Sequence, residues 1–152
     1  MTDVYVSAHT VSVHIGRPPP EVFDFITTCS SWPRWHPATV SVAGAVDHPA
    51  REGEVIVEKV RHGILRDTFP WEVMECRPPE RWQIRGKSKR YGQKVKITYA
   101  LNPRDGGTLW EREMRFYLPG WFALLDRLFF AAMLRRNSET AVRQLKELLE
   151  SP

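Results

Sequence analysis

Apolar and polar residues alternate along most of this chain in the two-residue rhythm of β-strands. The segment from Val4 to Ile15 is rich in β-branched residues, and Val11, Val13 and Ile15 alternate with Ser12 and His14, which predicts a first strand there. Turn-forming residues such as Pro, Gly, Asn and Asp separate the later alternating segments. We therefore expect further strands near 38–46, 53–61, 66–76, 80–86, 92–101 and 108–117. Short connections between successive strands predict an antiparallel meander.

Helical patterns occur near both ends of the chain. Glu21–Ile26 predicts a short helix after the first strand, with Pro20 in its first turn. A second, very short helix is expected to end before Pro37. After Leu118 we expect one long helix that runs to about Leu149.

The two halves of the predicted C-terminal helix differ in character. From position 121 to 134 the polar residues are Asp126 and Arg127, so nearly every side of the helix is apolar. From Arg135 onward the helix has one apolar stripe among charges. A helix that is apolar all round is buried on several sides, or it faces something other than water.

This order of elements predicts an α+β fold in one domain over residues 1–152. We expect a curved antiparallel sheet of about seven strands wrapped around the long C-terminal helix, with two short helices after the first strand. The long helix is the element that can cover the apolar face of the sheet. A bent sheet around one helix leaves a hollow, and we expect residues 121–134 to contribute to its lining.

Composition adds little that is specific. Hydrophobic residues make up 42% and charged residues 26% of the 152, which is typical of a globular chain of one-domain length. The net charge of +4 favours anionic partners weakly, and an ordinary solvated surface explains it as well.

The cysteines and the start of the sequence bear on the compartment. Cys29 and Cys76 lie in no metal-binding spacing and fit reduced thiols in a cytoplasm. The first residues lack the basic and apolar regions of a secretory leader, and no apolar run is long enough to span a membrane. We expect a cytoplasmic protein.

Several segments of the chain resemble a known superfamily. They are VSVHIGRPPPEVFDFI (11–26), WPRWHP (32–37), WEVMECRPPERW (71–82) and GTLW (107–110). Together they are similar to the START and Bet v 1-like helix-grip superfamily, in its polyketide cyclase/dehydrase and lipid-transport branch. The resemblance implies a deep apolar cavity between sheet and helix that binds lipids, quinones, hormones or polyketides. Some members catalyse ring closure, dehydration or hydrolysis, but no universal catalytic motif can be carried over.

One charged residue falls on an apolar strand face. On the strand near 108–117, Trp110, Met114 and Phe116 share a face, and Arg112 belongs to the same set. An inward arginine is costly unless something pairs with it, and its planar fork of donors suits a carboxylate or an enolate. We expect Arg112 to anchor an acidic or carbonyl-bearing ligand. A core carboxylate as its partner, or a bulge that turns it outward, are the alternatives.

The stretch SWPRWHP at 31–37 places two tryptophans, two prolines and a histidine close together. We interpret it mainly as a stiff aromatic wall, in which Trp32 and Trp35 share a helical face. His36 has no second ligand at metal spacing, so no metal site is expected. His36 is instead a candidate general acid or base, beside the plainer role of a bond to the backbone.

Other aromatic residues are candidates for the cavity lining, and plain core packing is the alternative for each. Tyr99 also brings a hydroxyl that could orient a ligand carbonyl, and Met133 is an adaptable lining residue. The predicted ligand-binding set is Trp35, Phe69, Trp71, Trp82, Tyr99, Trp110, Arg112, Phe122, Phe129 and Met133. The catalytic candidates are His36, Tyr99 and Arg112.

These features leave two main hypotheses for function. The first is binding, with or without transport, of a hydrophobic, ring-containing small molecule such as a lipid, quinone or polyketide. The second is a polyketide aromatase/cyclase-type enzyme, which polar groups converging on one point of the cavity would favour. Peripheral membrane contact through residues 118–134 is a further reading, nucleic-acid binding is not favoured, and no cofactor is expected. The oligomeric state is left open.

Overall fold

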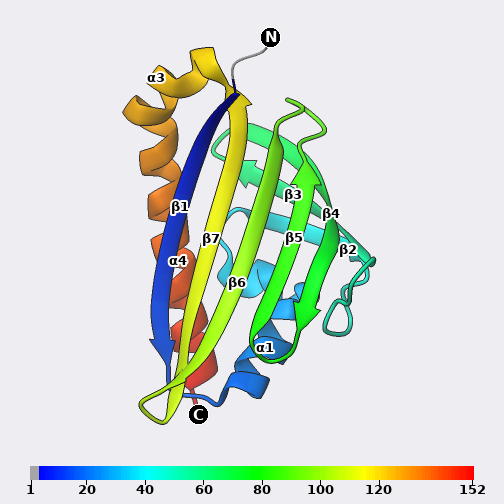
Figure 1. Ribbon diagram of the computed structural model, residues 1–152, viewed down its shortest axis with the longest axis vertical. Helices are drawn as coiled ribbons and strands as arrows, with labels where there is room; N and C mark the ends of the chain where they lie inside the picture. Colours follow the sequence, from blue (N-terminus) through cyan, green and yellow to red (C-terminus); the bar gives the residue numbers. More distant parts are fainter. Residues whose placement is uncertain (1–3) are drawn as a thin grey trace.

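Within residues 4–152, which the computed structural model describes, seven strands form one antiparallel sheet (Figure 1). The first three residues of the predicted domain lie outside the described residues. Neighbouring strands follow the order β1-β7-β6-β5-β4-β3-β2, so only β1 departs from a simple meander. The strands are β1 (Val4–Ile15), β2 (Thr39–Gly44), β3 (Val55–His62), β4 (Leu65–Arg77), β5 (Arg81–Lys87), β6 (Lys94–Arg104) and β7 (Gly107–Pro119).

Two short helices, α1 (Pro19–Thr27) and α2 (Trp32–Trp35), follow β1 and cover one end of the sheet. A single 3₁₀ turn over Cys29–Ser31 joins them. The helix α4 (Ala131–Glu150) lies along the concave side beside β1 (Figure 1). The predicted helix-grip fold, with its curved sheet and long C-terminal helix, is confirmed.

The helical stretch before α4 is less regular than the pattern predicts. It consists of a 3₁₀ turn over Gly120–Phe122, the short α3 (Ala123–Leu125) and a π-helical turn over Asp126–Phe130. Figure 1 shows α3 crossing the end of the molecule before the chain turns into α4. A π turn widens the helix by one residue and resets which side chains face inward.

The end of the sheet near α1 and α2 is filled by aromatic side chains. Trp35 packs edge-on against Trp110, with ring centroids 5.8 Å apart, and Tyr99 packs against Trp110 at 5.3 Å. Trp82 lies 5.2 Å from Tyr99 and donates its indole N–H to the carbonyl of Ala50. These geometries are favourable for aromatic pairs, so this half of the interior is a solid core.

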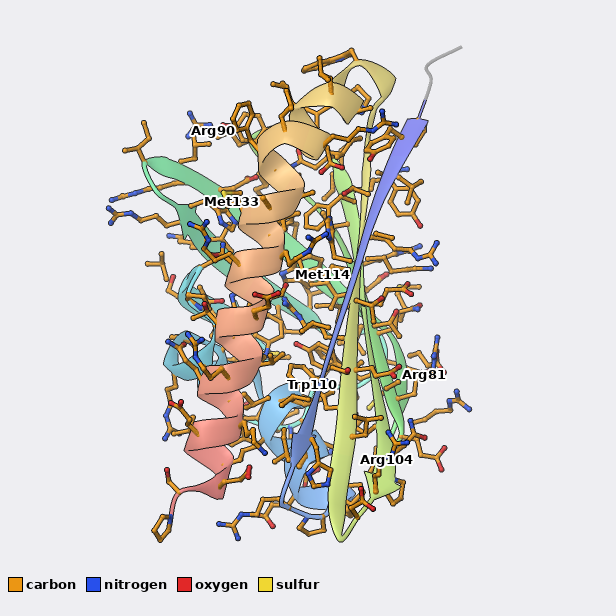
Figure 2. The ribbon with its side chains drawn as sticks, turned by 90° about the vertical axis from the view of Figure 1, so that its left-hand side faces the viewer. Arg81, Arg90, Arg104, Trp110, Met114 and Met133 are labelled. Atoms are coloured by element: carbon orange, nitrogen blue, oxygen red, sulfur yellow. The ribbon has the colours of Figure 1, made fainter. Side chains whose placement is uncertain are left out.

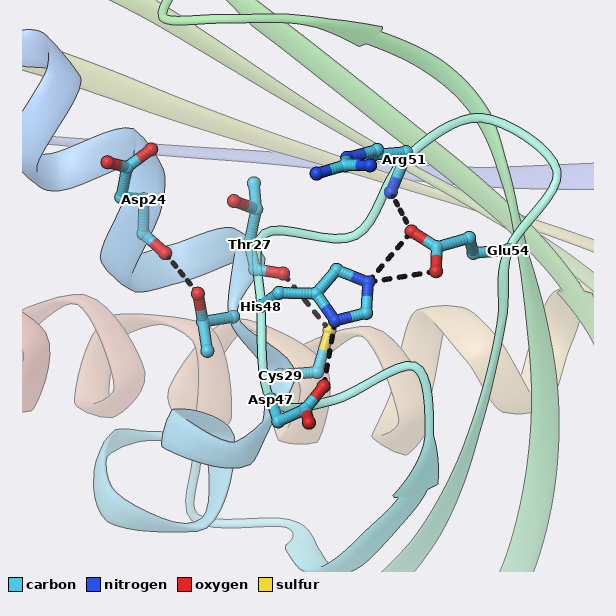
Figure 3. Close-up of polar contacts among 8 residues, drawn as sticks. Asp24, Thr27, Cys29, Asp47, His48, Arg51 and Glu54 are labelled. Carbon is cyan, nitrogen blue, oxygen red and sulfur yellow. Dashed lines mark hydrogen bonds and ion pairs between the residues drawn. The ribbon is translucent and has the colours of Figure 1, made fainter.

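A polar clamp holds the loop between β2 and β3 on the outer surface (Figure 3). The ring of His48 bonds Asp47 through Nδ1 at 2.7 Å and Glu54 through Nε2 at 2.8 Å. Hydrogen bonds to these two carboxylates raise the pKa of His48. The clamp lies outside the interior and fixes the loop conformation.

No helix described within 4–152 has both the length and the apolar character needed to cross a membrane.

Candidate functional site

A cavity of about 580 Å³ lies between the concave face of the sheet and the C-terminal helical segment. This volume is in the range of sites that hold small organic molecules. Most of the lining is apolar or aromatic, and it comes from β3, β4, β6, β7 and the helical residues after β7. The apolar and aromatic lining residues include Val60, Leu65, Phe69, Trp71, Tyr91, Val95, Ile97, Met114, Phe116, Trp121, Phe122, Phe130, Met133 and Leu134.

Strand alternation directs these side chains inward. On β7 every second residue from Trp110 to Leu118 faces the helix, and Met114 lies between sheet and helix in Figure 2. Trp110 lies farther along the strand, near α1, where the interior is closed (Figure 2). The strand therefore passes from packed core to cavity wall along its length.

One wall of the cavity is a flat aromatic surface on β4. The rings of Phe69 and Trp71 stack at 5.1 Å with an interplanar angle of 10°. Gly86 on β5 is paired with Trp71, and a Cβ at this glycine would lie 2.7 Å from Trp71 Cε3. Glycine at position 86 is therefore needed for the indole to lie against the sheet.

Arg112 is the central polar group of the lining. It is only 3% exposed, and its Nη2 lies 3.1 Å from Nε2 of His36. Its Nη1 makes a long bond of 3.4 Å to the hydroxyl of Ser138 on α4. Among the described residues, no hydrogen-bond partner is found for its Nε.

A chain of hydrogen bonds connects Arg112 to a buried carboxylate. Nδ1 of His36 lies 3.0 Å from Oγ1 of Thr39, and the Thr39 hydroxyl donates to Glu58 at 2.5 Å. The second oxygen of Glu58 accepts the indole N–H of Trp71 at 3.0 Å. We name Arg112, His36, Thr39 and Glu58 the polar relay.

The chemistry of its members sets the direction of the polar relay. Arginine can only donate, so Nε2 of His36 accepts and the neutral ring carries its proton on Nδ1. The Nδ1–H then donates to Thr39, whose own proton goes to Glu58. Glu58 is the terminal acceptor, and in its ionised form it is the indirect partner of the guanidinium.

The pKa values in the polar relay follow from burial. Removal from water holds the pKa of His36 well below its usual value, and the Arg112 charge lowers it further. Burial raises the pKa of Glu58, although its hydrogen bonds and Arg112 oppose this. His36 is therefore neutral at neutral pH and its free lone pair is occupied by Arg112, so it positions the guanidinium.

The structure brings part of the predicted site to the cavity. Arg112, His36, Phe69, Trp71, Phe122 and Met133 all belong to the lining. Arg112 is inward as the alternation predicts, but its partners are a histidine and a serine, and the core carboxylate is reached only through the polar relay.

Other predicted site residues lie elsewhere. Trp35, Trp82, Tyr99 and Trp110 are at most 2% exposed and belong to the packed aromatic end, not to the lining. Strands β5, β6 and β7 turn Trp82, Tyr99 and Trp110 inward as expected, but at their level α1 and α2, which carries Trp35, fill the space. The tryptophans of the 31–37 stretch thus close the interior behind the cavity.

Phe129 is placed on the opposite side from the predicted one. It is 68% exposed and is absent from the lining, whereas Phe122, Asp126 and Phe130 turn inward. Residues 121–134 contribute to the lining through Trp121, Phe122, Phe130, Met133 and Leu134, but the prediction of Phe129 as a lining residue is wrong.

Glu58, Thr39 and Ser138 line the site or join its polar relay without having been predicted from the sequence. A signal for Glu58 was present, because Ile56, Glu58 and Val60 alternate on one strand face just as Trp110, Arg112 and Met114 do. Thr39 and Ser138 carry no comparable signal, since small hydroxyl residues are common on either face of an element.

Nucleophilic and metal chemistry have no visible centre in the described part of the chain. Burial raises the pKa of the Cys29 thiol, and the Cys76 thiol pKa is raised as well. Residues 4–152 contain no cluster of three or more His, Cys, Asp or Glu side chains that could hold a metal ion.

The match to a protein-family model covers nearly the whole chain. A family model described as polyketide cyclase / dehydrase and lipid transport matches residues 8–150. No curated protein sequence matches the chain.

Solved structures share the fold at low sequence identity. TTHA0849 from Thermus thermophilus has a TM-score of 0.75 at 15% identity, covering 94% of this chain and 97% of that one. The di-domain ARO/CYC BexL from the BE-7585A biosynthetic pathway has a TM-score of 0.73 at 17% identity, covering 97% of this chain and 51% of that one. Ara h 8.0201 has a TM-score of 0.67 at 13% identity, covering 97% of this chain and 100% of that one.

Proposed function

Since the chain belongs to the polyketide cyclase/dehydrase and lipid transport family, we propose that its cavity binds a hydrophobic, ring-containing molecule with an acidic or carbonyl oxygen. The observation that carries this proposal is Arg112, a buried guanidinium in an otherwise apolar lining. Such a molecule would place its oxygen on Arg112 and its rings along the aromatic walls.

The state of Arg112 supports an oxygen ligand. A buried charge is stable only when paired, and the structure gives this guanidinium one firm bond, one long bond and an unpartnered Nε. A carboxylate or enolate accepts two parallel N–H bonds from such a fork. An oxygen bound there would replace the weak Ser138 contact.

The lining supports a planar, apolar body for the ligand. The stacked pair Phe69 and Trp71 offers a flat face, and Phe116 and Phe130 meet edge-on at 5.4 Å across the strand–helix interface. Aromatic walls bury large areas of ring surface at little conformational cost. A fused-ring compound therefore fits the lining better than a compact polar one.

The test compares anthraquinone-2-carboxylic acid with its neutral amide by calorimetry. The acid is expected to bind the wild type, and Arg112→Leu is expected to weaken its binding by roughly tenfold or more, because a charge-assisted bond is lost. The amide should lose only a small part of its affinity. Glu58→Gln should tighten binding of the acid, since the competing negative charge is gone.

Arg115→Leu is the matched control, because Arg115 lies on the same strand but points to the outer face, where it bonds Glu113. It should leave both affinities unchanged. Equal losses for acid and amide in Arg112→Leu would contradict the anchor role. Absence of binding by both compounds would contradict the proposed ligand class.

Catalysis of the aromatase/cyclase kind is a second candidate. The observation that favours it is the convergence of Arg112, His36 and Ser138 at one place in the lining, with Glu58 behind them. Arg112 would stabilise a developing enolate oxygen, and Glu58, whose pKa is raised, would be the stronger base. Tyr99 does not line the cavity, so this candidate does not depend on its hydroxyl.

Deuterium exchange at the α-carbon of α-tetralone, followed by NMR in D₂O, tests the second candidate. An enzyme should accelerate exchange over buffer, and both Arg112→Leu and Glu58→Gln should abolish the acceleration. An exchange rate equal to that of buffer alone would leave the binding function standing and remove the catalytic one.

A further inference from the structure

The helical segment after β7 presents an unpartnered apolar face to the outside. Its outward side chains are spaced by three and four residues, which places them on one side of a helix. They are between 44% and 74% exposed, while the opposite side carries the inward residues Phe122, Asp126 and Phe130. The outward residues are Trp121, Leu124, Leu125, Leu128 and Phe129.

This face adjoins the opening of the cavity. Trp121 both lines the cavity and is 74% exposed, so the cavity reaches the surface beside it. Leu65 and Tyr91 are also lining residues with about half of their surface exposed, and Ile64 at the β3–β4 turn is almost fully exposed. We call this set of exposed apolar residues the apolar rim. Its members are Ile64, Leu65, Tyr91, Trp121, Leu124, Leu125, Leu128 and Phe129.

The charge around the apolar rim is mostly positive, and the nearby Asp67, which lines the cavity, accepts hydrogen bonds from the Ser88 hydroxyl and the backbone N–H of Arg90. The segments 61–66 and 86–94 contain basic residues and no acidic one. In 118–136 the one carboxylate is Asp126, which is buried and accepts bonds from Tyr5 and Ser7. The exposed basic residues are Arg61, Arg66, Lys87, Lys89, Arg90, Lys94, Arg127, Arg135 and Arg136.

The apolar rim and the basic residues around it can be located in Figures 1 and 2. Figure 1 places α3 and the β5–β6 turn at the same end of the molecule. Figure 2 shows Arg90 at that end, away from Trp110 and the packed aromatic core. The apolar rim, the basic residues and the cavity opening therefore share one end.

We propose that the apolar rim docks on an anionic lipid bilayer, with the cavity opening turned toward the membrane. Apolar side chains on such a face enter the boundary between headgroups and acyl chains, and basic residues around them meet the phosphates. A second copy of the chain is the other obvious cover for an apolar face. A two-fold contact between copies would bring the basic residues of both together, so the charge favours the bilayer.

Docking in this way goes beyond the proposed function. A molecule bound at Arg112 would pass between the acyl layer and the cavity without crossing water, and this consequence rests on the proposed ligand. The docking itself does not rest on the proposed ligand, because it depends on the outer face alone.

Co-sedimentation with phosphatidylcholine vesicles, with and without phosphatidylglycerol, tests the proposal. The wild-type protein is expected to bind the vesicles with phosphatidylglycerol and to be released by high salt. Phe129→Glu should weaken binding by at least roughly tenfold, because it places a charge in the apolar layer. Arg135→Glu should weaken binding to the vesicles with phosphatidylglycerol and should not change the affinity for vesicles of phosphatidylcholine alone.

Val40→Glu is the matched control, because Val40 is a comparably exposed apolar residue on β2, outside the apolar rim. It should bind vesicles like the wild type. Phe129 does not line the cavity, so Phe129→Glu should keep the affinity for anthraquinone-2-carboxylic acid in solution, and this separates the two proposals. The docking is overturned if the wild type binds no vesicles, if Val40→Glu loses as much as Phe129→Glu, or if lipid-free protein is a dimer that Phe129→Glu dissociates.

Discussion

At the scale of single residues, Arg112 and Glu58 are the groups that the interior stabilises least easily. Each is buried, and each would cost several kcal/mol if it were charged and unpaired. His36 and Thr39 join them through directed hydrogen bonds, and through these bonds an ionised Glu58 offsets the charge of the guanidinium. Removing a single member is therefore expected to disturb the others more than its own bonds suggest.

The lowered pKa of His36 predicts a pH dependence of folding. The unfolded chain takes up the proton near pH 6.5, whereas the folded protein does so only at much lower pH. The stability that neutral His36 contributes is thus complete above about pH 6.5 and is lost as the pH falls below it. The loss is at most about 1.4 kcal/mol per pH unit.

His36→Gln isolates this effect, because glutamine can accept from Arg112 and donate to Thr39 without titrating. The difference in the free energy of unfolding between the wild type and His36→Gln, from urea melts, should decline from pH 7 to pH 5 (about 1.4 kcal/mol per unit at the steepest). Glu58→Gln should show the opposite slope, because a raised carboxyl pKa stabilises the folded state as the pH falls. A flat difference for His36→Gln would show that the ring is not held neutral.

At the scale of elements, one carboxylate ties the end of the helical segment to the edge of the sheet. Asp126 lies in the π turn and accepts the hydroxyl protons of Tyr5 at 2.9 Å and Ser7 at 3.0 Å on β1. These bonds fix which side of the segment faces inward. They therefore hold Phe122 and Phe130 in the cavity and the apolar rim outside.

Asp126→Ala is expected to loosen this segment without unfolding the sheet. The loss of two hydrogen bonds to a charged group should cost about 2 kcal/mol locally. Hydrogen–deuterium exchange followed by mass spectrometry should show faster exchange in 120–130 and unchanged protection in β4–β6. Asp24→Ala on α1, whose carboxylate is exposed, is the control, and equal exchange in the two variants would contradict the tether.

At the scale of the whole molecule, the interior is divided into a packed end and a hollow end. The same strands build both, and the difference comes from what lies opposite them. Near α1 and α2 the sheet meets two helices and bulky rings, whereas toward the other end it meets α4 across a space that side chains do not fill. This division places the polar relay at the inner end of the cavity and the apolar rim at its mouth.

Much of this architecture could be predicted from the sequence, because it depends on local periodicity. The two-residue alternation located the strands to within a few residues and turned Arg112 inward, and the turn residues predicted the meander. The same rule applied to Ile56, Glu58 and Val60 would have found the second buried charge.

The sequence by itself determined the elements, their order and the inward face of each strand, since side-chain direction follows from backbone geometry. Only the tertiary structure decided which inward residues meet empty space, because alternation fixes a face but not the distance to the element across from it. For that reason Trp110 and Tyr99 lie in the core while Phe69 and Trp71 line the cavity. The polar relay joins residues from the end of α2 and from β2, β3 and β7, and a contact between separate elements leaves no local pattern in the chain.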